Sequence, residues 1–311
     1  MVQFERNKSL RKFSNYEIGG PADYFCAPQT IDELASALRD WGTSGKIFIL
    51  GGGTNLLISD DGFRGLVLKP ELRSIVIEGN TVRVGAGMLM QDLLAATIEA
   101  GLSGLEWAGG LPGTVGGAVR GNAGAFGGET KDRVTEVRSV KTDVERQQEM
   151  IRTNAECRFG YRNSIFKERD GEEIVTEAVF ALTPGSREAI AKAIEEKKEY
   201  RRTRHPIEHP NIGSIFKNVD LKNVSASVQK QFASVIKKDP FPVIPTACLL
   251  AEAGLKGIAH GGAIVSPKHP NFIVNMGSAR ASDVKALIAL IKKTIHEKFG
   301  VILEEEVIWV E

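Results

Sequence analysis

The segment from Gly110 to Glu129, GLPGTVGGAVRGNAGAFGGE, constrains the fold more than any other part of the chain, because eight of its twenty residues are glycine. A flexible linker is polar and repetitive, whereas apolar residues such as Val115, Val119 and Phe126 interrupt these glycines. Glycine has no Cβ, so backbone N–H groups can come within hydrogen-bond distance of a ligand. The segment therefore predicts ordered loops that close around a ligand.

Two shorter glycine clusters, at 51–55 (GGGTN) and 85–87 (GAG), lie earlier in the chain. The first follows a buried strand predicted at 47–50, and such a turn makes a concave nest of N–H donors that suits a pyrophosphate. It is not the G-x-G-x-x-G fingerprint followed by a helix, and the chain contains no P-loop motif. Tight turns in a strand-rich domain would explain one cluster, whereas three together favour a dinucleotide or similar ligand.

Helix signals divide the chain into a strand-rich N-terminal part and a smaller C-terminal part. One helix begins at a capping box formed by Thr30 and Glu33, and another ends at Gly101. A long helix begins after Ser186 and must stop before Pro206. Alternating segments before the long helix predict strands, and the residues after it predict a helix, a strand pair, a helix and a terminal strand. The pattern predicts an α+β fold with a domain boundary near the long helix.

Composition and charge exclude several classes of function. The 311 residues carry a net charge of +1, so we expect no general attraction to nucleic acid or to an anionic membrane. No apolar run approaches the ~20 residues that span a bilayer, and the first residues lack the apolar core of a signal peptide. The three cysteines, Cys26, Cys157 and Cys248, form no C-x-x-C pair. We therefore expect reduced thiols in a cytoplasmic protein without a metal site.

Two segments carry a resemblance to a known family. PGTVGGAVRGNAGAFG at 112–127, together with LGGGTNLLISDDGFRGLVL at 50–68, resembles the flavin-binding region of the UDP-N-acetylenolpyruvoylglucosamine reductase family. That family belongs to the larger group of FAD domains of the p-cresol methylhydroxylase and vanillyl-alcohol oxidase type. Five motifs follow the family's order, from NYEIGGPADYF at Asn15 to LEEEVIWV at Leu303. The resemblance therefore covers nearly the whole chain.

The resemblance implies an FAD-binding domain over residues 1–188, in two lobes of about 1–70 and 71–188, followed by a smaller α+β substrate-binding domain over 189–311. FAD would be bound noncovalently, with its pyrophosphate on the first glycine cluster and the glycine-rich segment wrapped around the rest. The implied cofactor-binding residues are Gly51, Gly52, Gly53, Thr54, Asn55, Pro112, Gly113, Thr114, Gly116, Gly117, Asn122, Ala123 and Gly124.

The resemblance also implies three catalytic residues. In FGYRNSIFK, Arg162 matches an active-site arginine, which would pair with a substrate carboxylate. In NIGSIFKN, Ser214 matches a proton-donating serine, and in the terminal LEEEV, Glu306 matches a glutamate that stabilises charge. A surface ion pair, a plain turn and a solvated acidic tail are the structural alternatives. Along one continuous strand Glu304 would share a face with Glu306, so strand alternation does not separate these two glutamates.

Seven further residues are implied as contacts of a UDP-linked substrate: Tyr161, Arg204, Lys217, Asn218, Lys268, His269 and Asn271. Arg204 lies in the basic run from Lys197 to His205 and would reach the diphosphate. Cations at the end of a helix equally suit the negative end of its dipole, so a solvated helix end is the alternative for this run.

At three places the sequence can be compared with features that vary within the family. Arg162 and Ser214 are 52 positions apart, which is typical of the branch without the tyrosine-bearing loop over the substrate. We therefore assign no capping tyrosine. Val219 stands where the family usually has proline, and Cys248 stands where it often has tryptophan.

The implied activity is an NADPH-dependent reduction of UDP-N-acetylglucosamine enolpyruvyl ether to UDP-N-acetylmuramate, in peptidoglycan precursor synthesis. Hydride would come from the reduced flavin and a proton from Ser214, with charge stabilised by Arg162 and Glu306. The expected partners are small molecules only, and the expected state is a monomer. Another FAD-dependent oxidoreductase or oxidase of the same group, and a non-catalytic nucleotide-binding module, are the alternative functions.

Overall fold

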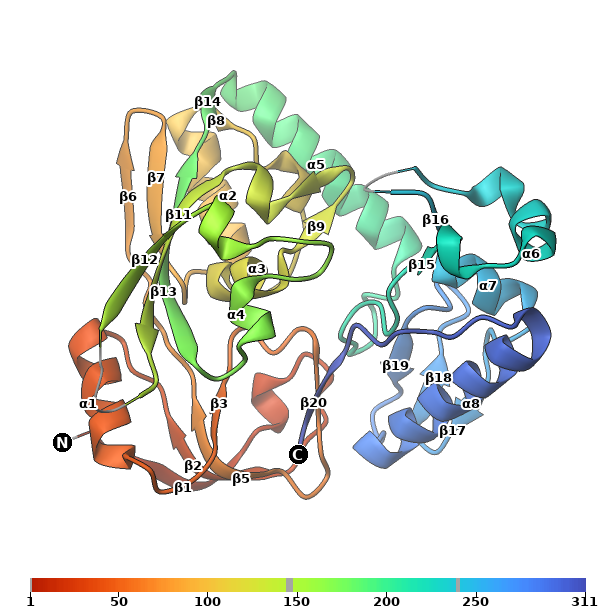
Figure 1. Cartoon of the computed structure of the whole chain (residues 1–311), viewed down its shortest axis with the longest axis horizontal. Helices are drawn as coiled ribbons and strands as arrows, with labels where there is room; N and C mark the ends of the chain where they lie inside the picture. Colours follow the sequence, from red (N-terminus) through yellow and green to blue (C-terminus); the bar gives the residue numbers. More distant parts are fainter. Residues whose placement is uncertain (1, 144–147, 239–240) are drawn as a thin grey trace. The chain divides into compact units, whose positions relative to one another are not determined.

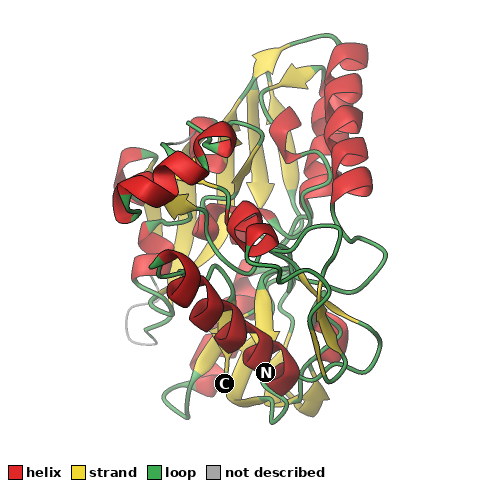
Figure 2. Cartoon of the chain, turned by 90° about the vertical axis from the view of Figure 1, so that its right-hand side faces the viewer, coloured by secondary structure: helices red, strands yellow, loops and turns green. Residues whose placement is uncertain are grey.

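The computed structural model describes residues 2–143, 148–238 and 241–311, and it combines helices, strands and long loops (Figure 1, Figure 2). The chain forms two compact units, each assembled from separate stretches of sequence. Unit 1 consists of Met1–Lys8, Ala22–Gly52 and Arg64–Tyr200, and unit 2 consists of Ser9–Pro21, Gly53–Phe63 and Arg201–Glu311. The division expected after residue 188 and the two expected lobes stay predictions.

The larger sheet of unit 1 has five antiparallel strands in the order β12-β11-β13-β7-β6 (Figure 1). Their bounds are β6 Ile75–Glu78, β7 Thr81–Gly85, β11 Val134–Lys141, β12 Glu149–Thr153 and β13 Glu173–Ala181. A tight turn joins β6 to β7, and Gly79 adopts a φ of 59° there, which glycine does without steric cost. The alternating segments within 75–85, 134–141 and 173–181 therefore form strands, as predicted, and the structure makes these strands neighbours in one sheet.

One face of this sheet is buried beneath short helices. Val84, Val137 and Ala178 lie on this face and are fully buried with Leu93 of α2 in one hydrophobic cluster. Burying one side chain of the size of valine or leucine contributes roughly 1.5–3 kcal/mol, so this cluster is a main source of stability for unit 1. The helices are α2 Met90–Ala100, α3 Val115–Gly121 and α4 Ile165–Glu168, and α2 ends at a left-handed Gly101 as predicted.

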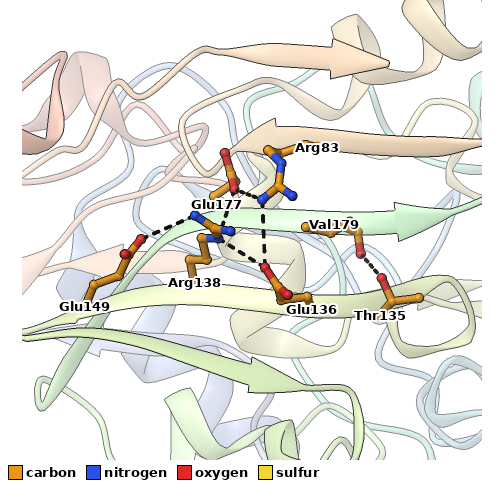
Figure 3. Close-up of polar contacts among 7 residues, drawn as sticks. All are labelled: Arg83, Thr135, Glu136, Arg138, Glu149, Glu177 and Val179. Atoms are coloured by element: carbon orange, nitrogen blue, oxygen red, sulfur yellow. Dashed lines mark hydrogen bonds and ion pairs between the residues drawn. The ribbon is translucent and has the colours of Figure 1, made fainter. Parts of the chain in front are cut away.

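Charged side chains cover the opposite face of the same sheet (Figure 3). Arg83 on β7 donates to Glu177 on β13 at 2.8 Å. Arg138 on β11 lies 3.1 Å from Glu136 and 3.4 Å from Glu177, and its Nη1 lies 3.8 Å from Glu149 on β12. The pairs alternate in sign across four strands, so like charges do not face one another directly.

A β-bulge interrupts the pairing of β11 with β13 between Val134 and Glu136. Thr135 is the extra residue, and its hydroxyl donates to the carbonyl of Val179 at 3.2 Å (Figure 3). Thr135 has no backbone pairing partner on β13, and its side chain bonds to that strand instead.

The smaller sheet of unit 1 packs against α1 Ile31–Trp41. The amide of Glu33 donates to Thr30 Oγ1 at 3.1 Å, which confirms the predicted cap. Leu34 and Leu38 of α1 are fully buried with Leu66 of the sheet. The strand order is β1-β2-β5-β3, with β3 and β5 parallel, and the bounds are β1 Glu5–Ser9, β2 Pro21–Cys26, β3 Ile47–Ile49 and β5 Phe63–Leu68.

The long helix predicted after Ser186 is α5 Arg187–Arg204. Its first turn is capped, because the amide of Ala189 donates to the Ser186 hydroxyl at 3.3 Å, and it ends before Pro206 as expected. Two short strand pairs complete unit 1, namely β8 Leu102–Ser103 with β14 Thr183–Pro184 and β9 Gly124–Ala125 with β10 Gly128–Glu129.

Unit 2 joins N-terminal and C-terminal segments in one core. Tyr16 is fully buried, and its hydroxyl donates to the carbonyl of Ile273 at 2.8 Å. Asp60 accepts hydrogen bonds from the amides of Ala281 and Ser282, at 2.8 and 3.1 Å, at the start of the long C-terminal helix. An N-terminal loop therefore caps a helix more than two hundred residues away in sequence.

The elements of unit 2 are short except for that helix, α8. A three-stranded sheet lies beside α8, and β4 pairs in parallel with β20 (Figure 1). The bounds are β4 Leu56–Ile58, β15 Val219–Asp220, α6 Ala226–Gln231, β16 Val243–Ile244, α7 Thr246–Glu252, β17 Ala259–His260, β18 Ala263–Val265, β19 Ile273–Asn275, α8 Ala281–Phe299 and β20 Ile308–Val310.

The C-terminal segment is not the single continuous strand that the sequence predicts. Its backbone changes partner along the way: the amide of Glu306 donates to the carbonyl of Ile215 at 2.8 Å, and that of Ile308 donates to Asn55 at 3.1 Å. Only the last part, β20, forms a regular strand. The segment bonds to two different parts of the chain instead of pairing with one strand along its whole length. The strand alternation expected to place Glu304 and Glu306 on one face therefore does not apply here.

No helix in the described part of the chain is both long enough and apolar enough to cross a membrane. The same residues contain no group of three or more His, Cys, Asp or Glu side chains that could hold a metal ion. Burial raises the pKa of Cys26 to about 11 and that of Cys157 to about 12, so both thiols stay protonated near neutral pH.

Candidate active site

The two main glycine loops of unit 1 pack directly against each other. A Cβ on Gly52 would lie 2.6 Å from the Cα of Gly113, and a Cβ on Gly51 would lie 3.0 Å from Thr114 Oγ1. Side chains at these positions would separate the loops. The glycines were predicted to allow a ligand to approach, and contact between the two loops is a second reason for them that local sequence could not reveal.

Several backbone N–H groups of these loops make no hydrogen bond within the described structure. In unit 1 they belong to Gly51, Gly52, Gly113 and Thr114. In unit 2 they belong to three consecutive residues, from Gly53 to Asn55. Unpaired amides in succession are the donor set that phosphate oxygens require, so each of the two sets, taken by itself, suits a phosphate group.

Other predicted cofactor residues use their amides within the protein. The N–H of Gly116 donates to the carbonyl of Ala86 at 2.8 Å, and the N–H of Ala123 donates to Ala118 at 2.8 Å. Gly117 donates to the hydroxyl of Thr114 at 3.3 Å, which caps α3. These amides hold the loop together, so any contact of Gly116, Gly117 or Ala123 with a cofactor would use other atoms.

Asn122 is fully buried at the C-terminal end of α3, with a left-handed φ of 41°. Its Nδ2 donates to the carbonyl of Gly160 at 2.8 Å and to Glu129 Oε2 at 3.2 Å, while its Oδ1 accepts from the amide of Lys131 at 3.1 Å. The predicted role of Asn122 in cofactor binding stays a prediction. Glu129, the last residue of the glycine-rich segment, was not predicted to have a role at this site.

Arg162 sits in a tight turn closed by paired backbone hydrogen bonds between Gly160 and Asn163, at 3.0 and 3.1 Å. Its φ of 54° is left-handed, which is costly for a residue with a long side chain. Arg162 Nη2 donates to the carbonyl of Gly124 at 3.0 Å, and the guanidinium carbon lies 5.5 Å from the ring centroid of Tyr161. Unit 1 therefore brings Arg162 and the predicted cofactor residue Gly124 together.

Ser214 follows Gly213, whose φ of 82° turns the chain sharply. The amide of Gly213 donates to Asn211 Oδ1 at 3.0 Å, which fixes this turn. The side chain of Ser214 is partly exposed, and no described residue forms a hydrogen bond with its hydroxyl. The hydroxyl is therefore available to a bound molecule.

Asn271 holds the other end of the serine loop. Its Nδ2 donates to the carbonyl of Phe216 at 2.8 Å, and its Oδ1 accepts from the amide of Phe216 at 3.1 Å. The backbone carbonyl of Asn271 accepts from Ile215 at 2.8 Å. Asn271 is buried, so these bonds order the two residues that follow Ser214. Its predicted contact with substrate stays a prediction.

Glu306 lies beside the same loop in unit 2. Its amide donates to the carbonyl of Ile215 at 2.8 Å, and its own carbonyl accepts from Asn55 Nδ2 at 2.9 Å. Unit 2 therefore brings together Ser214, Glu306 and Asn55, which the sequence predicted as three parts of one site.

The neighbouring glutamates make ion pairs. Glu304 pairs with Lys217, and its side chain is 72% exposed. Glu305 accepts from Lys292 at 2.8 Å and from the indole N–H of Trp309 at 2.6 Å. The side chains of Glu304 and Glu305 each have a partner within unit 2.

The remaining predicted substrate contacts lie at element ends and loops of unit 2. Asn218 Oδ1 accepts from the amide of Thr246 at 3.2 Å, at the start of α7. Lys268 Nζ donates to the carbonyl of Arg202 at 2.9 Å and lies 3.3 Å from Glu208. Arg204 is the exposed last residue of α5.

His269 lies in an aromatic cluster that sequence analysis did not predict. Its ring centroid is 4.7 Å from that of Phe272 and 5.4 Å from that of His205. Burial lowers the pKa of His269. Burial, together with the proximity of His269, Arg201 and Lys268, lowers the pKa of His205 to about 4. Both imidazoles are therefore neutral near pH 7.

Comparisons with known proteins agree with this arrangement. Residues 22–147 match the model of an FAD binding domain, and residues 205–310 match that of the UDP-N-acetylenolpyruvoylglucosamine reductase C-terminal domain. The expected order, an FAD-binding domain followed by a smaller α+β domain, is confirmed.

Relatives and a solved structure extend the match to the full chain. The UDP-N-acetylenolpyruvoylglucosamine reductase of Carboxydothermus hydrogenoformans is 38% identical over 97% of this chain and 93% of its own length. That of Halalkalibacterium halodurans is 38% identical over 97% and 92%. The crystal structure of the reductase from Thermus caldophilus matches with a TM-score of 0.78 and 31% identity over the whole of both chains. The chain therefore belongs to the UDP-N-acetylenolpyruvoylglucosamine reductase family.

Proposed function

We propose that this protein reduces UDP-N-acetylglucosamine enolpyruvyl ether to UDP-N-acetylmuramate, with FAD bound noncovalently and NADPH as the reductant. It would act in the cytoplasm, as a monomer, on small molecules only. The observation that carries the proposal is in unit 2, where the backbone hydrogen bond from Glu306 to Ile215 holds a carboxyl-bearing residue beside the available hydroxyl of Ser214. Membership of the family supports the same reaction.

The loop amides would hold the cofactor. Gly51, Gly52, Gly113 and Thr114 in unit 1 offer unpaired N–H groups to phosphate oxygens, as do Gly53 to Asn55 in unit 2. When bound, FAD supplies the hydride that is added to the terminal vinyl carbon of the substrate.

Arg162 would bind the substrate carboxylate. Its guanidinium presents a planar fork of donors, which matches a carboxylate in a two-point interaction. Addition of hydride to the vinyl carbon increases negative charge on the neighbouring carbon and on its carboxylate. A fixed positive charge at this position therefore stabilises the transition state more than the ground state.

Ser214 would deliver a proton to the carbon that carries this charge. A hydroxyl is a weak acid, so the surrounding groups must stabilise the negative charge that remains. Glu306, held by Ile215 and Asn55, would contribute to charge stabilisation around the same carboxylate. Tyr161, Arg204, Lys217, Asn218, Lys268, His269 and Asn271 would contact the UDP-linked remainder of the substrate.

An anaerobic titration in two steps tests the proposal. Purified holoprotein is mixed with NADPH, and the yellow absorbance should bleach. The enolpyruvyl substrate is then added without oxygen, and the colour should return with one equivalent of UDP-N-acetylmuramate formed. Bleaching that reverses only with oxygen would instead indicate an oxidase, and retention of colour throughout would indicate a non-catalytic nucleotide-binding module.

A further inference from the structure

We propose that Asn122 is a positioning residue for Arg162. Its side-chain amide joins the turn that carries Arg162 to the β9–β10 hairpin that binds the guanidinium. The inference rests on the proposed function, in which Arg162 pairs with the substrate carboxylate. All of the contacts that carry it lie within unit 1.

The amide of Asn122 is fully engaged with the protein. A primary amide has two N–H donors, and those of Asn122 bond to the carbonyl of Gly160 and to the carboxylate of Glu129, at 2.8 and 3.2 Å. Its oxygen accepts from the amide of Lys131 at 3.1 Å. The side chain is 0% exposed, so both donors act inside the protein rather than on a ligand.

These bonds belong to a cyclic hydrogen-bond network that includes Arg162. Asn122 bonds to Gly160, which closes the Arg162 turn, and Arg162 bonds to the carbonyl of Gly124 at 3.0 Å. Gly124 pairs with Glu129 across the hairpin, and Glu129 bonds back to Asn122. The backbone of Arg162 is thus held by the turn and its guanidinium by the hairpin, and Asn122 bonds to one residue of each, Gly160 and Glu129.

The hairpin itself is fixed against the rest of unit 1. A Cβ on Gly128 would lie 2.5 Å from the indole of Trp107, so the hairpin lies directly on that side chain. At its tip, the ring of Phe126 is 5.1 Å from that of Tyr200, and Lys197 Nζ lies 5.4 Å from the centroid of Phe126. The carbonyl of Gly124 is therefore a fixed anchor for Arg162.

Backbone conformation points to the same two segments. Of the six non-glycine residues with positive φ in the described structure, four lie here: Asn122, Phe126, Arg158 and Arg162. Such conformations persist where surrounding contacts impose them, and they concentrate at functional sites. Asparagine tolerates a left-handed conformation better than most residues, so Asn122 meets the backbone demand and supplies the hydrogen bonds together.

The test compares Asn122→Gly with the wild-type holoprotein. Glycine keeps the left-handed backbone and removes only the three side-chain bonds. We expect the KM for the enolpyruvyl substrate to rise at least tenfold, by a larger factor than any fall in the NADPH-dependent bleaching rate. In the background of Arg162→Ala, Asn122→Gly should cause no further rise in the KM for the enolpyruvyl substrate, because both changes remove the same contact with the substrate carboxylate.

Ser139→Ala is the matched control, because Ser139 is fully buried in β11 and donates to Glu173, away from the Arg162 turn. A lower occupancy of FAD, a shifted flavin spectrum or equal slowing of both steps in Asn122→Gly would overturn the proposal and assign Asn122 to the cofactor. If Asn122→Gly does not fold, Asn122→Asp keeps the shape, loses both donors and should show the same rise in KM.

Hydrogen–deuterium exchange separates this inference from the proposed function, because it needs no substrate. The amides of Gly160 and Asn163 are hydrogen-bonded in the turn, so their peptide should exchange faster in Asn122→Gly than in wild type or Ser139→Ala. Unchanged exchange there overturns the positioning role even if the enzyme is active. Faster exchange supports it even if the colour of the wild-type protein never returns with substrate, a result that would refute the proposed function alone.

Discussion

The backbone amide of Glu306 donates a hydrogen bond to the carbonyl of Ile215, 2.8 Å away, so Glu306 is fixed one residue from Ser214. This bond joins the last segment of the chain to a loop about ninety positions earlier. Because the bond is between backbone atoms, it does not depend on the identity of either side chain. Substitution of Ser214 or Glu306 should therefore change chemistry with little effect on the loop.

Ser214→Ala should slow the return of colour on addition of substrate by about 10²–10⁴-fold, the usual contribution of general acid catalysis. Bleaching by NADPH should keep its rate, because the proposed proton transfer belongs to the second step. Anaerobic stopped-flow absorbance measures the two steps separately. Ser225→Ala is the control, since Ser225 caps α6 in the same unit and has no predicted contact with substrate. Equal slowing of both steps would refute the role assigned to Ser214.

Arg162→Ala should lower the rate of the second step by about 10²–10³-fold, because it removes a fixed charge-stabilising donor. Arg162→Lys should recover only part of this loss, since an ammonium group cannot bind a carboxylate through a planar fork. Arg120→Ala, which breaks an exposed ion pair with Asp170, is the control and should leave both steps unchanged. Full activity in Arg162→Lys would show that charge alone suffices and that the two-point geometry is wrong.

Gly52→Ala should lower both stability and retention of FAD, because its Cβ would meet the backbone of Gly113 at 2.6 Å. Gly121→Ala is a matched control in α3, where a Cβ would have nothing within 4 Å. There alanine should be neutral or stabilise the helix by about 0.5–1 kcal/mol. Thermal melting and the ratio of flavin to protein absorbance measure both effects. Wild-type behaviour of Gly52→Ala would contradict the close contact between the glycine loops.

Stability should fall as the pH is lowered from about 6.5 toward 4, in part because of His205. Its pKa is lowered to about 4 in the folded protein, chiefly by burial. Between this value and the ordinary value near 6.5, the unfolded chain binds more protons, so acidification favours unfolding. His205→Gln should reduce the pH dependence of the urea midpoint in this range. His260→Gln is the control, because His260 is exposed. If the urea midpoints of His205→Gln and His260→Gln depend on pH in the same way, His205 is not the cause.

Asp60→Ala should destabilise unit 2 by about 1–2 kcal/mol, because it removes the acceptor for two amides at the start of α8. Denaturant unfolding of the holoprotein measures the change. Asp23→Ala breaks an exposed ion pair with Arg64, so it should cost less than about 1 kcal/mol. If the two variants lose equal stability, the cap on α8 does not contribute as the geometry indicates.

Local signals predicted the elements that local interactions determine. The cap at Thr30, the left-handed Gly101 and the start of α5 at Ser186 are all present, because each depends on residues within one helical turn. The predicted terminal strand is present only in its last part, β20, because the hydrogen-bond partners of the segment, Ile215 and Asn55, come from distant parts of the chain. No local pattern shows which backbone will lie beside a segment of alternating residues.

The candidate site shows the same limit. Motifs selected Arg162, Ser214 and Glu306. The left-handed conformation of Arg162 could not be predicted, because such a conformation is usually signalled by a glycine and this position has none. The contact between Gly52 and Gly113 was equally hidden, since a glycine that accommodates a neighbouring loop looks the same in sequence as one that accommodates a ligand. Both features depend on tertiary neighbours rather than on local propensity.

The composition of unit 2 has a consequence for biosynthesis. β4 is made more than two hundred residues before its partner β20, and all three of its residues are buried in the finished protein. Until β20 has been made, this apolar strand lacks its partner, and until Ile273 has been made, Tyr16 lacks the carbonyl that its hydroxyl requires. The nascent chain therefore carries an unpaired apolar edge while the long segment between the two strands is synthesised, and deletion of β20 should leave this edge exposed to aggregation.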